Sequence, residues 1–305
     1  MTIGSLSPRE LAGRLSGEGL YFRTGQFQVR VQSSLPSFAS SLGLLYADYP
    51  LASPDGFTDF HLRINSPNRM RRYVRSQVVF EFDGVQPFKP LPMAQAFPIF
   101  EWGLNWCVSS AVNSYLIIHA AVIEKDGKAA ILPAPPGSGK STLCAALINR
   151  GWRLLSDELT LVRISDGRIV PLPRPVSLKN ASIDIIAAYQ PSAIFSPKVF
   201  DTIKGTIAHM KPPAGSVANA GESAPPAWII FPRYVGGAAT QMVPMPPAGG
   251  FMKLADNCFN YSALGANGFN TIARLMDHCK CFEFSYSVMD EAIEAFATLA
   301  QPLPA

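Results

Sequence analysis

The residues whose types and spacing are best suited to chemistry lie at positions 134 to 142, which read APPGSGKST. Glycines let consecutive backbone N–H groups curl around one anion, and the N-terminus of a helix adds the positive end of its dipole. In such a phosphate-binding loop Lys140 would contact the β- and γ-phosphates of a nucleotide, and the Ser141 hydroxyl would bind Mg²⁺. Ala134 replaces the first glycine of the usual pattern, which mainly shapes the turn into the loop. We therefore predict ATP binding through Pro136, Gly137, Ser138, Gly139, Lys140, Ser141 and Thr142.

A phosphate-binding loop does not identify a reaction, so groups that could activate an acceptor must lie nearby. His119 lies 21 residues before Lys140, and the pair Asp157-Glu158 begins 17 residues after it. Neighbouring side chains on a regular strand point to opposite faces, so both carboxylates can serve one site only if the chain bends there. We expect one carboxylate to face the γ-phosphate and the other to contact Mg²⁺ or support the first.

The elements that would position these residues are visible from residue 115 onward. Residues 117–124 and 128–132 read as two strands on either side of the turn Asp126-Gly127, which predicts a β-hairpin leading into the loop. Residues 142–150 have helical spacing and end at Gly151, a residue suited to the position after a helix. The remaining pattern predicts strands at 152–155, 159–164 and 168–172, a mobile surface loop at 205–226, a helix at 268–277, a strand at 280–286 and a helix at 289–299.

The first third of the chain has a different organisation. Ser7, Pro8 and Glu10 form the signature of a helix start, and the helix should stop near Gly17. We therefore predict a smaller α+β domain over residues 1–110, whose role the sequence does not reveal, and a second domain over 111–305 that contains the loop. Within the first domain we expect strands at 27–31, 57–64 and 77–82, a proline-rich linker at 86–98 and an aromatic-faced helix at 99–114.

Composition excludes several classes of protein. An apolar fraction of 48% and a charged fraction of 16% are typical of a globular fold and differ from those of disordered chains. The formal net charge is only +4, and the basic run at residues 70–75 lacks a stacking platform, so we expect no nucleic-acid partner. No signal pattern or membrane-length apolar run is present, which predicts a cytoplasmic protein without a membrane partner.

The five cysteines do not predict a disulfide scaffold or a strong metal site. Their number is odd and their spacing irregular, which agrees with a reducing compartment. Cys279 and Cys281 would share one face of a strand, but no second ligand pair accompanies them as a zinc site requires.

Three stretches together resemble the catalytic domain of bacterial HPr kinase/phosphorylase: LIIHAAV at 116–122, the loop at 134–142, and RGWRLLSDE at 150–158. That family carries a histidine before the loop and an acidic pair after it, at the spacing found here. The chain is more similar still to the branch called HprK-related kinase A, and this resemblance covers nearly its whole length. Further stretches that resemble the branch are EWGLNW at 101–106, PRPVSLKN at 173–180, KGTIAH at 204–209 and FPRY at 231–234.

The resemblance implies a mixed α/β (α+β) fold with a P-loop kinase domain of the HPr kinase/phosphoenolpyruvate carboxykinase-like type. It also implies ATP- and Mg²⁺-dependent phosphoryl transfer to a hydroxyl, a serine above all, of a small protein or peptide. By position, Asp157 would accept the hydroxyl proton and His119 would tune it. Ser141 and Glu158 are the candidates for binding the metal, and the residues alone leave open which of the two carboxylates is the base and which is the metal ligand. A PqqD-like peptide-binding protein is an implied partner, and the hexamers of the parent family make a homo-oligomer an open alternative.

Several departures from the family leave the acceptor open. Ala120 replaces a glycine, Glu158 replaces an aspartate, and the family's later signature with a further glutamate is not recognisable. That region holds basic residues instead, so Arg174 and Lys179 are candidates for binding phosphate or an acidic acceptor, with Lys204, His209 and Arg233 as weaker ones. A metabolite kinase of the same fold and a non-catalytic ATP sensor remain alternatives.

Overall fold

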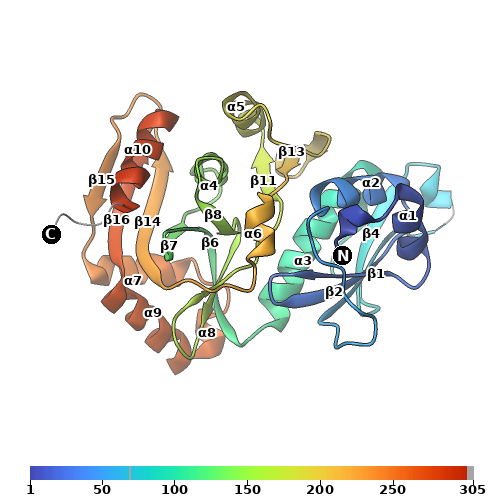
Figure 1. Ribbon diagram of the computed structural model, residues 1–305, viewed down its shortest axis with the longest axis horizontal. Coiled ribbons are helices and arrows are strands. Elements are labelled where there is room, and N and C mark those ends of the chain that lie inside the picture. The colour runs from blue at the N-terminus through green and yellow to red at the C-terminus, as the bar shows by residue number, and fades with distance from the viewer. Residues whose placement is uncertain (69, 301–305) are drawn as a thin grey trace.

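The computed structural model describes residues 1–68 and 70–300 and shows a mixed α/β protein with several sheets (Figure 1). The N-terminal part is built on a sheet with the strand order β1-β2-β3-β4-β5. Strands β2 and β3 run parallel, whereas the other neighbours run antiparallel. The strands are β1 (Leu20–Thr24), β2 (Phe27–Gln32), β3 (Phe60–Asn65), β4 (Gln77–Phe82) and β5 (Leu91–Pro92).

Helix α1 (Pro8–Ser16) begins as the sequence predicts. The Glu10 N–H donates to the Ser7 hydroxyl at 3.3 Å, and the Ser7 N–H donates to the Glu10 carboxylate at 2.8 Å, which is a capping box. The helix buries Leu11 and Leu15 and packs beside α2 (Pro36–Leu45). Three short 3₁₀ segments complete this part: η1 (Ile3–Ser5), η2 (Met70–Arg72) and η3 (Met93–Gln95).

Helix α3 (Ala96–Ala111) lies between the N-terminal sheet and the rest of the molecule (Figure 1). It starts three residues before the predicted position, inside the stretch interpreted as a linker. One hydrophobic cluster continues through it from the N-terminal strands to Ile117, Leu159 and Leu161. The predicted boundary near residue 110 therefore falls at the end of a helix that is buried against both parts, and the division into two domains stays a prediction.

The largest sheet carries the predicted hairpin at its centre. Its strand order is β10-β9-β6-β7-β14-β16-β15, and β8 also pairs with β6. The hairpin is confirmed, because β6 and β7 are antiparallel neighbours on either side of Asp126 and Gly127. The strands are β6 (Tyr115–Lys125), β7 (Lys128–Pro133), β8 (Arg153–Ser156), β9 (Leu159–Arg163), β10 (Ile169–Val170), β14 (Pro226–Tyr234), β15 (Gln241–Pro244) and β16 (Lys280–Tyr286).

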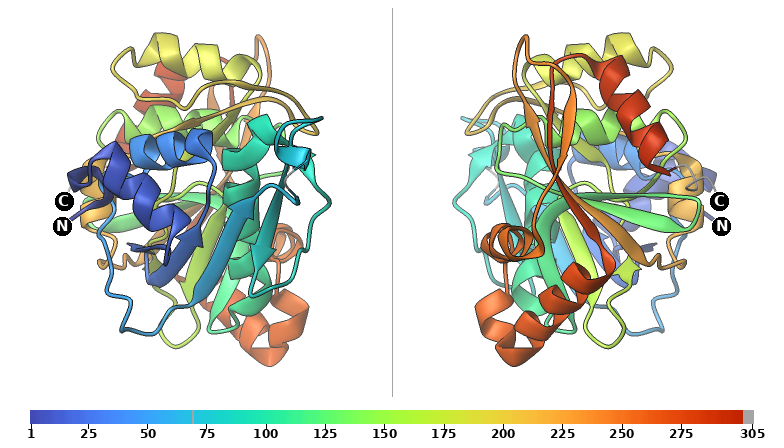
Figure 2. Two further views of the ribbon diagram at one scale, coloured as in Figure 1. Left: turned by 90° about the vertical axis from the view of Figure 1, so that its right-hand side faces the viewer. Right: turned by 90° about the vertical axis from the view of Figure 1, so that its left-hand side faces the viewer.

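Helices cover both faces of this sheet, as the right-hand view of Figure 2 shows for its C-terminal strands. Ala121 and Ile123 of β6 pack into the cluster that contains α4 (Lys140–Ile148) and α10 (Met289–Ala300). Ile118 and Val122 point to the other face, toward α7 (Pro247–Asp256) and α9 (Ala266–His278), with the short α8 (Tyr261–Leu264) nearby. The alternation of β6 residues thus separates two cores, and His119 shares the face of α4.

A third sheet, in the order β11-β13-β12, stands beside α4. Its strands are β11 (Val176–Lys179), β12 (Val199–Thr202) and β13 (Gly205–Met210). Helix α5 (Ala181–Tyr189) follows β11 in the chain, and α6 (Ala214–Ala218) follows β13. The prediction of a mobile loop over 205–226 is wrong for most of that stretch, because β13 hydrogen-bonds to strands on both sides and α6 buries Ser216 and Val217.

In residues 1–68 and 70–300, no helix is both long enough and apolar enough to cross a membrane.

Candidate active site

The predicted phosphate-binding loop connects the end of β7 to the start of α4. Gly137 and Gly139 have φ angles of 87° and 89°, which side-chain-bearing residues rarely adopt. The Tyr286 hydroxyl donates to the Gly139 carbonyl at 3.2 Å, and the Tyr234 N–H donates to the Ser138 carbonyl at 2.9 Å. The first N–H groups of α4 have no partner within the helix, so this end of α4 is suited to binding an anion.

Lys140 is buried at the first position of α4, with only 6% of its surface exposed. Among the described residues, neither its Nζ nor the Ser138 hydroxyl has a hydrogen-bond partner. Burial lowers the pKa of Lys140, while the charges of Asp157 and Glu158 act in the opposite direction. A buried cation without a direct partner is costly, and an anion bound in the loop would relieve that cost. Thr142, by contrast, already donates to the Ser182 hydroxyl at 2.8 Å.

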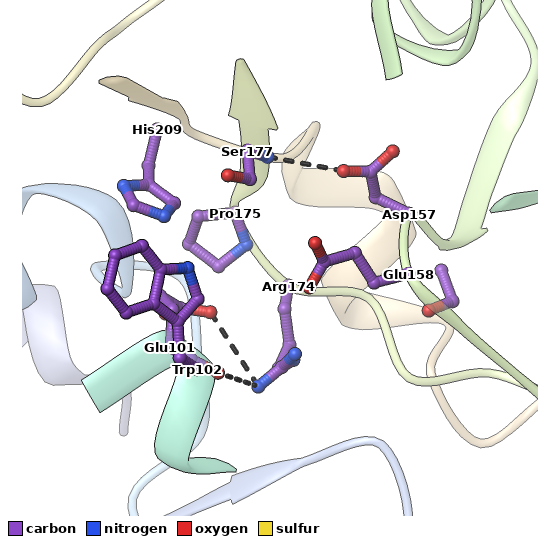
Figure 3. A pocket seen from close by; sticks show the side chains of 9 residues that line it. Glu101, Trp102, Asp157, Glu158, Arg174, Pro175, Ser177 and His209 are labelled. Carbon is purple, nitrogen blue, oxygen red and sulfur yellow. Dashed lines mark hydrogen bonds and ion pairs between the residues drawn. The ribbon is translucent and has the colours of Figure 1, made fainter. Parts of the chain in front are cut away.

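The acidic pair lies at the same edge of the sheet as the loop. Strands β7 and β8 both run antiparallel to β6, on opposite sides of it, so their carboxyl ends meet at one edge. The chain bends at residues 157 and 158, between β8 and β9, as a shared site requires. Asp157 and Glu158 consequently line the same pocket, together with Trp102, Arg174, Ser177 and other side chains (Figure 3).

Asp157 is buried but only partly hydrogen-bonded. Its Oδ2 accepts from the Ser177 N–H at 3.2 Å, and its Oδ1 has no partner in the part of the chain that the structure describes (Figure 3). Burial raises the pKa of Asp157 to about 6; the charge of Lys140 opposes this rise and that of Glu158 adds to it. A carboxyl group with one free oxygen and this pKa can exchange a proton near neutral pH.

Glu158 has the opposite electrostatic setting. Burial alone would raise the pKa of Glu158, but the positive charges of Lys204, Lys140 and Lys179 bring it below its ordinary value. The Asn105 side-chain amide of α3 donates to Glu158 Oε2. Glu158 is therefore held in its ionised form, which suits a carboxylate that binds a cation.

Arg174 points away from the loop, toward α3 (Figure 3). Its Nη1 lies 3.6 Å from Glu101 Oε2, and its Nη2 donates to Asn105 Oδ1. Burial raises the pKa of Glu101 to about 7, against the effects of Arg174 and of the Tyr46 hydroxyl, which donates to Glu101 Oε1 at 2.6 Å. Arg174 thus has internal partners, and its predicted contact with an acceptor or phosphate stays a prediction.

His119 lies on β6 next to the start of the loop, because the adjacent Ala120 pairs with Pro133. Its ring packs 5.7 Å from that of Phe259, measured between centroids. Burial and the nearby charge of Lys140 lower the pKa of His119 to about 4, although Glu158 opposes the decrease. No hydrogen bond joins the His119 ring to Asp157 within the described residues, so their predicted cooperation is not visible as a direct contact.

The structure brings Lys179 and two of the weaker candidates, Lys204 and His209, to the acidic pair. Lys179 ends β11, and Lys204 lies in the turn between β12 and β13 with its Nζ 5.1 Å from the centroid of the Trp102 ring. His209 is 1% exposed, lines the pocket, and has no partner for its Nε2 among the described residues. Burial lowers the pKa of His209 to about 3.

Arg233 is on the other side of the loop. It is exposed near the end of β14, next to Tyr234, whose N–H contacts the loop.

Sequence reasoning did not identify the side chains that α3 contributes. Glu101, Trp102 and Asn105 belong to the stretch EWGLNW at 101–106, which resembles the HprK-related kinase A branch, but no role is predicted for them individually. Their spacing carries a signal, since residues 101 and 105 are four apart and share one face of a helix. Polar and ionisable side chains on a helix that is otherwise apolar are the feature that would have drawn attention to them.

Comparisons with known proteins bear on part of the chain. The model of a family described as SynChlorMet cassette protein ScmC matches residues 103–193. The matched segment contains Asn105, His119, the loop, the acidic pair and Arg174, and it ends before Lys204. A search of curated proteins found no match.

Proposed function

We propose that the protein is an ATP- and Mg²⁺-dependent kinase that transfers the γ-phosphoryl group to a hydroxyl, a serine above all, of a small protein or peptide. The observation that carries this proposal is the meeting of two complementary groups at one sheet edge. One is the loop with its buried Lys140, and the other is Asp157, whose pKa is about 6. Among the described residues, neither the Lys140 Nζ nor the Asp157 Oδ1 has a hydrogen-bond partner. An HPr-kinase-like P-loop domain over residues 111–305 is part of the proposal.

The loop residues fit the triphosphate of a nucleotide. The Lys140 Nζ and Ser138 hydroxyl, which lack partners among the described residues, supply donors, and the left-handed glycines expose backbone N–H groups. Ser141 and Glu158 would hold Mg²⁺, which supplies charge neutralisation on the phosphates. The described residues contain no cluster of three or more His, Cys, Asp or Glu side chains suited to a metal. That agrees with Mg²⁺, which usually takes one or two carboxylates and completes its shell with phosphate and water.

Asp157 is the proposed general base. A hydroxyl attacks phosphorus more readily as its proton leaves, and a base whose pKa lies close to neutrality accepts that proton efficiently. His119, with its pKa of about 4, is neutral at pH 7 and adds no positive charge beside Asp157. It would act by hydrogen bonding in the loaded site.

The acceptor is proposed to be a protein or peptide, presented by a PqqD-like binding protein. The cations Lys179 and Lys204 lie near Glu158, and Arg233 is exposed near the end of β14; all three would attract acidic groups of such a partner. The matching family is named as a cassette protein. This makes the products of neighbouring genes the first acceptors to test.

Nucleotide binding can be tested with Lys140→Ala and the fluorescent analogue mant-ATP. Loss of a charge-assisted contact of about 1.5–3 kcal/mol should weaken binding roughly 10- to 100-fold. Lys128→Ala is a matched control, because Lys128 is an exposed lysine at the far end of β7. Equal affinities of Lys140→Ala and the parent protein would remove the P-loop assignment. Transfer from ATP to small metabolites without any peptide would instead favour a metabolite kinase.

A further inference from the structure

A continuous line of buried and partly buried polar contacts connects the N-terminal part of the protein to the acidic pair. Tyr46 directly follows α2, and its hydroxyl donates to the Glu101 carboxylate on α3 at 2.6 Å. Glu101 pairs with Arg174, Arg174 donates to Asn105, and Asn105 donates to Glu158. Nothing in the proposed chemistry accounts for this line. Its members come from segments far apart in the sequence and end on one carboxylate of the pocket.

The two ends of the Asn105 side chain have defined roles. A guanidinium group carries only donors, so the side of the amide that faces Arg174 must be Oδ1. The Nδ2 group is then directed at Glu158 Oε2, where it acts as a donor to a carboxylate. Arg174 therefore selects one of the two orientations of the Asn105 amide, and that orientation fixes one oxygen of Glu158.

A contribution to stability alone does not explain these contacts well. Glu101, Arg174 and Tyr46 are 3%, 7% and 0% exposed, respectively, so the charges of the pair are removed from water. Replacing a buried ion pair by apolar side chains is often neutral or stabilising. Elsewhere α3 is packed through apolar side chains, and the hydrophobic cluster contains Phe97, Ile99, Phe100 and Leu104. The polar contacts occur on the side of α3 that faces the pocket (Figure 3).

We propose that Asn105 is a positioning residue that orients Glu158 for Mg²⁺, and that supplying Asn105 on α3, with Tyr46 and Glu101 behind it, is a role of residues 1–111. This inference rests on the proposed function, in which Glu158 binds the metal of the nucleotide complex. It makes the N-terminal part a component of the active site.

The test is the Mg²⁺ dependence of mant-ATP binding in Asn105→Leu, which keeps the volume of the side chain and removes its donor. Loss of an outer-shell partner typically costs 10- to 100-fold in metal affinity. The concentration of MgCl₂ that gives half of the Mg²⁺-dependent binding should therefore rise about 10-fold or more. Affinity for mant-ATP in EDTA should stay at the parent value, because Asn105 does not contact the loop. A general structural defect would change both quantities.

Three further variants make the result decisive. Asn105→Ser, whose hydroxyl is too short to bridge Arg174 and Glu158, should behave like Asn105→Leu and replaces it if that variant does not fold. Tyr46→Phe should raise the MgCl₂ requirement less, since it acts through two intervening groups. Ser109→Ala is the control on the same helix and should have no effect, because among the described residues the Ser109 hydroxyl bonds only to the Trp106 carbonyl.

The failures of the two proposals are distinguishable. A parent protein that does not bind mant-ATP, or binds it without regard to Mg²⁺, overturns the proposed function and this inference with it. A parent protein with Mg²⁺-dependent binding and folded Asn105 variants with an unchanged MgCl₂ requirement overturn this inference alone.

Discussion

Asp157 and Glu158 are adjacent in sequence and have pKa values that move in opposite directions. Burial has the largest effect on Asp157 and outweighs the charge of Lys140, so the pKa of Asp157 rises to about 6. Glu158 faces Lys204, Lys140 and Lys179, whose charges outweigh burial and lower its pKa. Two carboxyl groups with separated pKa values can take different tasks. These opposite shifts support the proposal in which Asp157 accepts the proton and Glu158 binds the metal, a division of roles that the sequence left open.

Asp157→Asn tests this division of roles. The amide keeps the size of the side chain but cannot accept a proton from the acceptor hydroxyl, so phosphoryl transfer should fall about 10²- to 10⁴-fold. Affinity for mant-ATP should remain within a few-fold of the parent value. Asp55→Asn, at an exposed aspartate of the N-terminal part, should leave both quantities unchanged. A sensor without chemistry predicts equal background rates for Asp157→Asn and the parent protein.

His209 should make stability depend on pH. Its pKa is about 3 in the folded protein, against an ordinary value of 6.5, so the unfolded chain binds more protons between these values. Stability from this group is fully present above pH 6.5 and is lost as the pH falls toward 3. In urea unfolding at a series of pH values, His209→Gln should show a shallower decline, by up to about 1.4 kcal/mol per pH unit. Parallel curves for the two proteins would mean that His209 is not buried as a neutral group.

At the scale of elements, α3 determines how the two parts of the protein meet. It packs on β3 and β4, presents Trp102 to the pocket and directs Asn105 at Glu158. Gly103 allows the close approach to the N-terminal sheet, because a Cβ atom there would lie 2.1 Å from the buried ring of Phe80. The position of α3, and with it that of Asn105, depends on this contact.

Gly103→Ala should therefore destabilise the protein. Overpacking of a filled core costs about 1–3 kcal/mol, which exceeds the gain of up to about 1 kcal/mol in helix propensity. Gly13→Ala on α1 is the matched control, since its added Cβ meets nothing within 4 Å, and it should be neutral or slightly stabilising. Chemical denaturation measures both. A Gly103→Ala variant as stable as Gly13→Ala would show that Phe80 moves aside without cost.

At the scale of the whole molecule, the sequence predicted the parts whose signals are local. The hairpin and the helix after the glycine-rich loop follow from turn residues and local spacing. Phosphate binding by that loop stays a prediction, and the bend at the acidic pair meets the condition for a shared site. The contacts of Asn105 and Trp102 could not be predicted in this way, because they depend on how α3 packs between two sheets. The prediction of a mobile loop at 205–226 is wrong for a related reason. β13 is stabilised by hydrogen bonds to β12, which directly precedes it, and to β11, which lies farther back in the sequence.

The central claim is that this protein moves phosphate from ATP to a hydroxyl of a protein or peptide through Lys140 and Asp157. The most direct test incubates it with γ-labelled ATP and Mg²⁺ and with the proteins and peptides encoded beside its gene, followed by mass spectrometry of the products. We expect a phosphorylated serine, or another hydroxyl residue, that forms with the parent protein and is lost with Lys140→Ala and Asp157→Asn. A phosphorylated product that forms equally with Asp157→Asn, or label that reaches only small metabolites, would contradict it.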